Sequence, residues 1–318
     1  MMDWYLSNIV LVQSTLTTLL LALSLQVPLR VGVFSFAGAG CYGIGGYAAA
    51  ISMTRYGMST LESVLVGTLL AGVIGFLLGL VVQRLTGLYL GMATIAFTLI
   101  VSVLAVNGGE FTGGATGIFG ALGELDTGHI LAVVLVVVAL LALSELGSMG
   151  RRVEAVRENP ELASALGVNV TRYRLAAFAV SGLLGGLSGA FTILLRTTIT
   201  PDAINFHLVV LALTVIIVGG SRSWVGALVG SVIFVWLPTA LDFVGEWEAV
   251  VYGVIVALAA VFLPEGVVGF VVNMYRKFQS RKHRSVLRSV GGGEESTELD
   301  QLPGEGTGEA LIARGAMK

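Results

Sequence analysis

Long apolar runs follow one another along most of the 318-residue chain. A helix needs roughly 20 apolar residues to cross a hydrocarbon layer about 30 Å thick, and runs of this length recur from residue 8 to residue 272. The alternating pattern of a membrane barrel strand is absent from the sequence. The pattern predicts an all-α, polytopic transmembrane helix bundle with spans at approximately 8–28, 31–50, 62–82, 88–106, 130–147, 173–195, 207–220, 224–243 and 249–272.

Nine spans are expected, and counts of eight or ten stay open. The run GVFSFAGAGCYGIGGYAAA is rich in glycine, so the second span is compatible with a broken or re-entrant helix lined by protein. The fourth and seventh runs are also weak.

The positions of Lys and Arg predict the orientation, because cytoplasmic flanks retain positive charge. With the amino terminus outside, the outer segments hold only Arg55 and Arg196. The inner segments hold Arg30, Arg84, Arg151, Arg152, Arg157, Arg172, Arg174, Arg222, Arg276, Lys277, Arg281, Lys282, Arg284 and Arg288. We therefore expect a multi-pass protein of the cell (inner or plasma) membrane with a cytoplasmic carboxyl terminus.

Composition agrees with this class and divides the chain in two. Hydrophobic residues make up 55% of the sequence and charged residues only 12%, about half the charged share of soluble domains. We expect a permease domain over 1–275, with a cytoplasmic loop at 148–172. Residues 276–318 begin with a basic flank and continue as a Gly- and Glu-rich stretch, which predicts a disordered cytoplasmic tail.

The sequence gives no sign of enzyme chemistry. It contains no phosphate loop, no Gly-x-Ser-x-Gly elbow and no His-Glu-x-x-His motif. Cys41 is the single cysteine, and His129, His207 and His283 lack ligand spacing. We expect no catalytic residue, metal, cofactor or nucleic-acid partner. The predicted spans also hold almost no ionisable residue away from their ends, which disfavours coupling to a proton or sodium gradient.

The cytoplasmic loop contains a polar stretch, ENPELASALG. Asn159 suits an N-cap, Pro160 the first helical position, Glu161 the positive helix end and Gly167 the C-terminal stop. These residues predict a short helix from Pro160 to Leu166. Its apolar residues fit a groove on another protein or the inner face of their own bundle, and local physics leaves both interpretations open.

The segment RRVEAVRENPELASALGVNVTRYRLAAFAVSGLLGGLSGAF resembles the cytoplasmic loop and following helix of LivM-type membrane permeases of branched-chain amino-acid ABC importers. Glu161 and Gly167 fit the family's Glu-Ala-Ala-x-x-x-Gly pattern, with Leu162 in place of the first Ala and Ala163 keeping the second. The resemblance implies an ATPase-coupling helix with Asn159, Pro160, Glu161, Ala163, Ala165, Leu166 and Gly167 as its coupling residues.

The resemblance extends from about residue 30 to residue 270, through SFAGAGCYGIGGYAAA, LYLGMATIAF, FTGGATGI, VIIVGGSRSWVGALVGSVIFVWLP and FLPEGVVG. After TIAF the family commonly continues Gly-Glu, whereas this chain has Thr98 and Leu99, and Ala115 replaces a Pro. Related permeases carry urea or short amides, so the solute stays open between these and branched-chain (hydrophobic) amino acids.

By resemblance, this permease subunit works in an ATP-driven importer by alternating access, and it is not itself an enzyme. The implied partners are a homologous LivH-type permease, two cytoplasmic ABC ATPases and an extracytoplasmic solute-binding protein. A gradient-driven carrier or a channel acting without an ATPase is the alternative from another class.

Polar residues within or beside the predicted spans are our candidates for the translocation path. They are Ser35, Tyr42, Tyr47, Thr94, Thr98 and Thr112, with Gly113 and Gly114 allowing close approach to backbone. The competing interpretation is that such hydroxyls bond their own helix or a neighbouring one.

Overall fold

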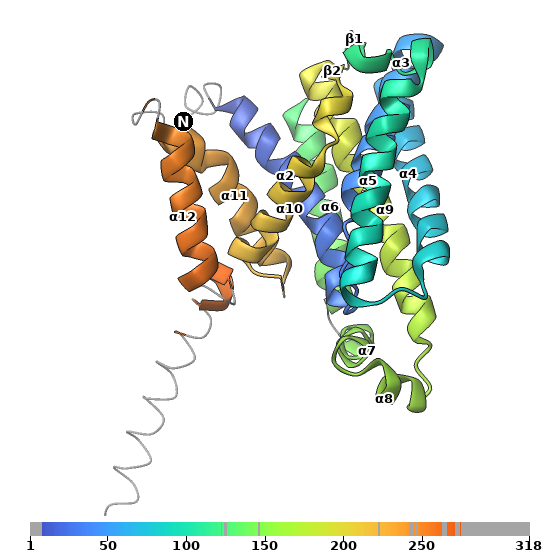
Figure 1. Ribbon diagram of the computed structural model, residues 1–318, viewed down its shortest axis with the longest axis vertical. Helices are drawn as coiled ribbons and strands as arrows, with labels where there is room; N and C mark the ends of the chain where they lie inside the picture. Colours follow the sequence, from blue (N-terminus) through green and yellow to red (C-terminus); the bar gives the residue numbers. More distant parts are fainter. Residues whose placement is uncertain are drawn as a thin grey trace, which may run out of the picture. The chain divides into compact units, whose positions relative to one another are not determined.

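The computed structural model describes residues 8–121, 123, 126–145, 147–221, 223–241, 245, 247–262, 266–270 and 274. The described part is a helix bundle, as predicted (Figure 1). Its helices are α2 (Ile9–Arg30), α3 (Ala37–Tyr56), α4 (Thr60–Val82), α5 (Gly87–Asn107), α6 (Thr127–Glu145), α7 (Gly147–Glu158), α8 (Pro160–Ala165), α9 (Val170–Arg196), α10 (Phe206–Gly219), α11 (Trp224–Leu241) and α12 (Glu248–Phe262).

Short elements occupy the connections. Three 3₁₀ turns, η1 (Gly109–Phe111), η2 (Gly114–Thr116) and η3 (Pro201–Ala203), flank two short strands. The strands β1 (Ile118–Phe119) and β2 (Thr198–Ile199) pair antiparallel, with Ile118 opposite Ile199. Figure 1 places this strand pair at one end of the bundle and α7 and α8 at the other.

Seven helical segments of the described chain are long and apolar enough to cross a membrane. They are Ile9–Arg30, Thr60–Val82, Gly87–Asn107, Thr127–Glu145, Val170–Arg196, Pro201–Gly219 and Trp224–Leu241. The other two predicted ranges also fall on helices, namely the glycine-rich α3 and the 15-residue α12. A polytopic all-α membrane bundle is therefore confirmed, and seven spans are assigned by length and composition.

Two features differ from the prediction: where the second span begins, and what the cytoplasmic loop contains. The second span was expected to begin at residue 31, but residues 31–36 are not helical and α3 starts at Ala37. The Thr94 hydroxyl accepts a hydrogen bond from the Phe36 backbone N–H at 3.0 Å, so α5 holds this connection in place. The loop predicted at 148–172 contains an additional helix, α7, which the sequence interpretation did not include. The predicted tail at 276–318 lies outside the described residues.

Glycine allows the central helices to approach closely. A Cβ on Gly182 of α9 would lie 3.1 Å from the Cα of Gly75 in α4, and a Cβ on Gly45 of α3 would collide with the backbone of Gly186 in α9. Small residues permit such backbone contact in membrane bundles. The four-residue glycine spacings of α4 and α9 therefore serve packing within this chain.

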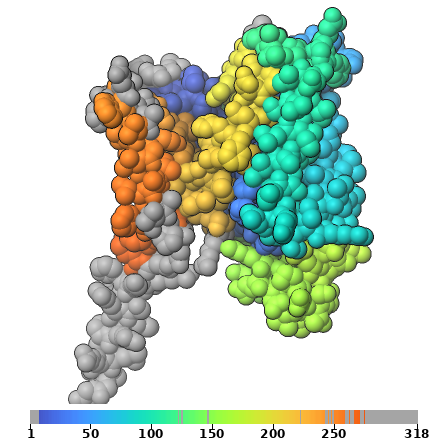
Figure 2. Space-filling model, in the orientation of Figure 1, coloured from blue at the N-terminus to red at the C-terminus, as the bar shows by residue number. Residues whose placement is uncertain are grey.

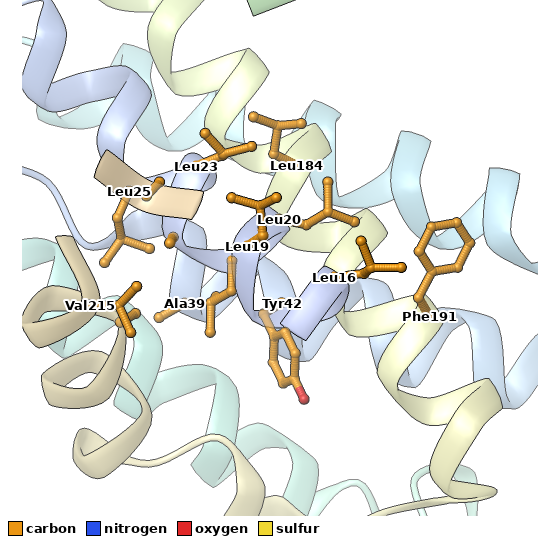
Figure 3. Close-up of a cluster of buried hydrophobic side chains, with 14 of the residues drawn as sticks. Leu16, Leu19, Leu20, Leu23, Leu25, Ala39, Tyr42, Leu184, Phe191 and Val215 are labelled. Carbon is orange, nitrogen blue, oxygen red and sulfur yellow. The ribbon is translucent and has the colours of Figure 1, made fainter. Parts of the chain in front are cut away.

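The main hydrophobic core surrounds α2, whose buried leucines contact α3, α9 and α10 (Figure 3). Buried polar groups secure the same helix. The Gln26 side-chain amide, 1% exposed, donates hydrogen bonds to the carbonyls of Ser221 (3.3 Å) and Ser223 (2.7 Å). These bonds join α2 to the connection between α10 and α11.

Candidate functional site

The short helix α8 begins as its sequence predicts. The Asn159 side-chain oxygen accepts a hydrogen bond from the Leu162 backbone N–H at 2.9 Å. Pro160 occupies the first turn, where its missing N–H leaves no helical bond unmade. Glu161 lies in the same turn, where a carboxylate is favoured by the helix dipole.

The other end of α8 is closed by a turn that requires glycine. Gly167 has φ +84°, a left-handed conformation that side chains with a Cβ rarely adopt. Its N–H donates to the Ser164 carbonyl, and the Val168 N–H donates to the Ala163 carbonyl, each at 3.0 Å. This pair of bonds is the Schellman arrangement. The helix ends one residue before the predicted Leu166, which acts as its C-cap.

The two faces of α8 have different environments. Ala163 is 1% exposed and packs with Val31 of the α2–α3 connection, Val156 of α7 and Ala177 of α9. Leu162 and Leu166 are 58% and 74% exposed. One face therefore anchors α8 to its own bundle, while its leucines remain uncovered by the described chain. Figure 2 shows α7 and α8 (yellow-green) projecting from one end of the surface.

A hollow of about 560 Å³ adjoins the exposed end of α8. Leu166 and Gly167 form one side, and Arg152 of α7 and Arg172 of α9 contribute cationic side chains. Apolar side chains and guanidinium groups are thus exposed together, which suits contact with a protein surface carrying acidic groups.

An ion pair connects the membrane helices beside α7. The Arg30 guanidinium, at the end of α2, pairs with the Glu145 carboxylate at the end of α6. Both side chains are largely buried, at 14% and 29% exposure. Close packing also occurs here, since a Cβ on Gly32 would lie 3.2 Å from the Cα of Arg157.

The path candidates Ser35, Thr94 and Thr98 form hydrogen bonds within the protein. The Thr94 hydroxyl bonds the Phe36 N–H and its own helix, the Ser35 oxygen accepts from the Ala37 N–H at 3.2 Å, and the Thr98 hydroxyl donates to the Thr94 carbonyl at 3.1 Å. All three are buried. The Ser35 and Thr94 hydroxyls bond the backbone at the break between α2 and α3, while the Thr98 hydroxyl bonds its own helix, α5.

The remaining candidates lie in three places: the core, the turns at η1 and η2, and a groove. Tyr42 is a buried core residue, while Gly113 and Gly114 have positive φ in the turns η1–η2. Tyr47 and Thr112 line a common groove of about 490 Å³ between α3, α4 and α5. Most of its lining is apolar and was missed, because the sequence search considered only polar residues. It includes Ile44, Ile51, Val66, Leu70, Ile74, Phe97, Ile100, Val101, Leu104 and Phe111.

The described chain is thus a polytopic helix bundle with a capped helix, α8, partly exposed at one end. Residues 6–260 match the family model described as "Branched-chain amino acid transport system / permease component". The chain belongs to this family.

Curated relatives include permeases for different solutes. The chain is 28% identical over 287 residues to the high-affinity branched-chain amino acid transport system permease protein LivM of Salmonella typhimurium, which covers 79% of this chain and 68% of that protein. It is 33% identical over 138 residues to the xylose transport system permease protein XylH of Escherichia coli (38% and 35% covered). It is 24% identical over 191 residues to the ribose import permease protein RbsC of Haemophilus influenzae (56% and 58% covered). No solved structure matches the chain.

Proposed function

We propose that this chain is the permease subunit of an ATP-driven importer of branched-chain amino acids. The LivM relative supports this solute because its similarity covers 79% of the chain, whereas the xylose permease matches 38%. The observation that carries the coupling role is the two-sided environment of α8, with Ala163 buried and the leucines exposed.

Its proposed partners are a homologous LivH-type permease, two cytoplasmic ABC ATPases and an extracytoplasmic solute-binding protein. In this assembly the amino terminus lies outside and α7 and α8 lie in the cytoplasm, as the distribution of Arg and Lys favours. The binding protein then docks at the end of the bundle that carries β1 and β2.

The mechanism is alternating access. ATP-driven closure of the ATPases presses on α8, and the packing of Ala163 against the α2–α3 connection, α7 and α9 transmits that movement to the spans. A partner changes the conformation only by contacting the two states differently. We therefore assign direct contact with the ATPases to Leu162, Ala165 and Leu166. The residues that form α8 and hold it in place are Asn159, Pro160, Glu161, Ala163 and Gly167.

Uptake by vesicles holding all the subunits tests the function. Labelled leucine, xylose and urea are compared with and without internal ATP. ATP-dependent leucine uptake supports the proposal, ATP-dependent uptake of xylose or urea would change the solute, and equal flux without ATPases would favour a carrier or channel. In the same vesicles, normal leucine uptake by Ala165→Arg would contradict the coupling role of α8.

A further inference from the structure

The groove between α3, α4 and α5 lies in the half of the bundle away from α8. It is lined by α3 from Gly43 to Ser52, by α4 from Val66 to Ile74 and by α5 from Phe97 to Ala105, with Phe111 and Thr112 at the end that carries η1. In the proposed orientation this is the outer half of the membrane. Its volume of about 490 Å³ falls in the range of small-molecule sites, roughly 300–1,000 Å³.

One polar atom in the groove lining lacks a partner. Tyr47 is 6% exposed, and its hydroxyl oxygen is buried without a hydrogen bond to any described residue. The Thr112 hydroxyl, in contrast, donates to the Ala105 carbonyl at 2.6 Å. Buried hydroxyls are nearly always hydrogen-bonded because leaving one unpaired is costly. An occupant of the groove that carries a hydrogen-bonding group can therefore satisfy this hydroxyl while its apolar part covers the walls.

A positive charge lies beside the same groove. The Arg55 guanidinium lies over the ring of Phe111, a lining residue, at 5.5 Å from the ring centroid. A solute with a branched aliphatic part and a carboxylate complements apolar walls, a free hydroxyl and a nearby cation. A lipid acyl chain fills only the apolar walls and leaves the Tyr47 hydroxyl unpaired.

We propose that this groove binds the transported solute, with its aliphatic side chain against α3, α4 and α5 and a polar group hydrogen-bonded to the Tyr47 hydroxyl. The inference rests on the proposed function and specifies where the solute lies. Leu70, at 45% exposure, forms part of the wall. Its neighbour Leu69, at 60% exposure, is outside the lining.

This neighbouring pair provides a matched test. Leu70→Trp narrows the groove, while Leu69→Trp adds the same bulk to the same helix outside it. In vesicles with the full importer, Leu70→Trp should lower leucine uptake at least about tenfold and alanine uptake less, because the smaller solute needs less room. Leu69→Trp should stay within about twofold of wild type. Tyr47→Phe, which removes only the hydroxyl, should lower leucine turnover about fivefold.

Control measurements distinguish the solute from a neighbouring subunit or a lipid as the occupant of the groove. Basal ATPase activity should be unchanged in Leu69→Trp, and the subunits should co-purify in all three variants. Loss of co-purification in Leu70→Trp alone would make the groove a subunit interface and overturn the proposal. Unchanged uptake in both Leu70→Trp and Tyr47→Phe, with normal wild-type leucine uptake, would overturn it in favour of lipid and leave the importer function standing. Absence of ATP-dependent leucine uptake by the wild-type importer would overturn both.

Discussion

The side chain of Asn159 caps α8 by accepting the Leu162 backbone N–H at 2.9 Å. Because α8 has only six residues, this bond is a large part of what holds its first turn. Asn159→Ala should cost about 1 kcal/mol of helix stability, and Asn159→Asp should preserve the cap. Hydrogen exchange at the amides of Leu162 and Ala163 should rise about fivefold in the Ala variant only. Exchange in the Asn159→Ala variant that equals exchange in the wild type would show that the cap is dispensable.

The left-handed Gly167 provides a second, independent test of the same helix. An added Cβ at this position meets no atom within 4 Å, so any cost of Gly167→Ala comes from its φ of +84°. The expected loss is about 1–2 kcal/mol. Gly167→Asn should cost less because Asn tolerates this conformation. Thermal unfolding of the purified protein, with exchange at the Val168 amide, would detect this order, and a reversed order would contradict it.

One substitution at two positions distinguishes anchoring from docking. Ala163→Glu places a charge among Val31, Val156 and Ala177, and should lower the unfolding midpoint by several degrees. Leu166→Glu changes a side chain that is 74% exposed, so the midpoint should stay near wild type while association with the ATPases is lost. Co-purification of the ATPases measures the second effect. Retained association with Leu166→Glu would exclude this face of α8 as a contact.

Local signals predicted much of the bundle and the ends of α8. The apolar runs located nine helices, and the residues Asn159, Pro160 and Gly167 identified a six-residue helix, because caps and span lengths depend on short-range chemistry. The helix α7 was missed although Val153 and Val156 stand three apart in RRVEAVRE, the spacing of a helix face. Its many charges hid that pattern.

Tertiary packing decided the features that local signals left open. The faces of α8 became distinguishable only when Ala163 was found to pack on other elements of the chain. Likewise, Ser35 and Thr94 looked like path residues, but the bond from the Phe36 N–H to Thr94 spans 58 positions and no local pattern predicts it. The groove is mostly apolar, so its lining resembles any membrane-helix surface until α3, α4 and α5 are assembled.

Close packing between α3 and α9 should make one small substitution severe. Gly45→Ala introduces a Cβ that collides with the Gly186 backbone, and forcing the helices apart should cost about 1–3 kcal/mol or more. Gly253→Ala in α12 is the matched control, since its Cβ meets nothing within 4 Å and alanine favours helix. The yield of folded protein and its unfolding midpoint should fall for Gly45→Ala and hold or rise for Gly253→Ala. Equal folded yields and unfolding midpoints for the two variants would argue against close contact between Gly45 and Gly186.

The Arg30–Glu145 ion pair should stabilise the junction of α2 and α6 beside α7. Both side chains are less than a third exposed, so removing one leaves a partly buried charge uncompensated, at a cost of about 1–3 kcal/mol. Glu145→Gln should therefore destabilise the protein more than the double variant Arg30→Gln/Glu145→Gln, in which no such charge remains.

Unfolding of all four proteins in detergent completes a double-mutant cycle for this pair. We expect an interaction energy of about 1 kcal/mol or more, since the groups are in direct contact. High salt should change this value little, because a pair with limited solvent exposure is weakly screened. Additive effects of the two single changes, within about 0.5 kcal/mol, would show that the pair contributes no stability.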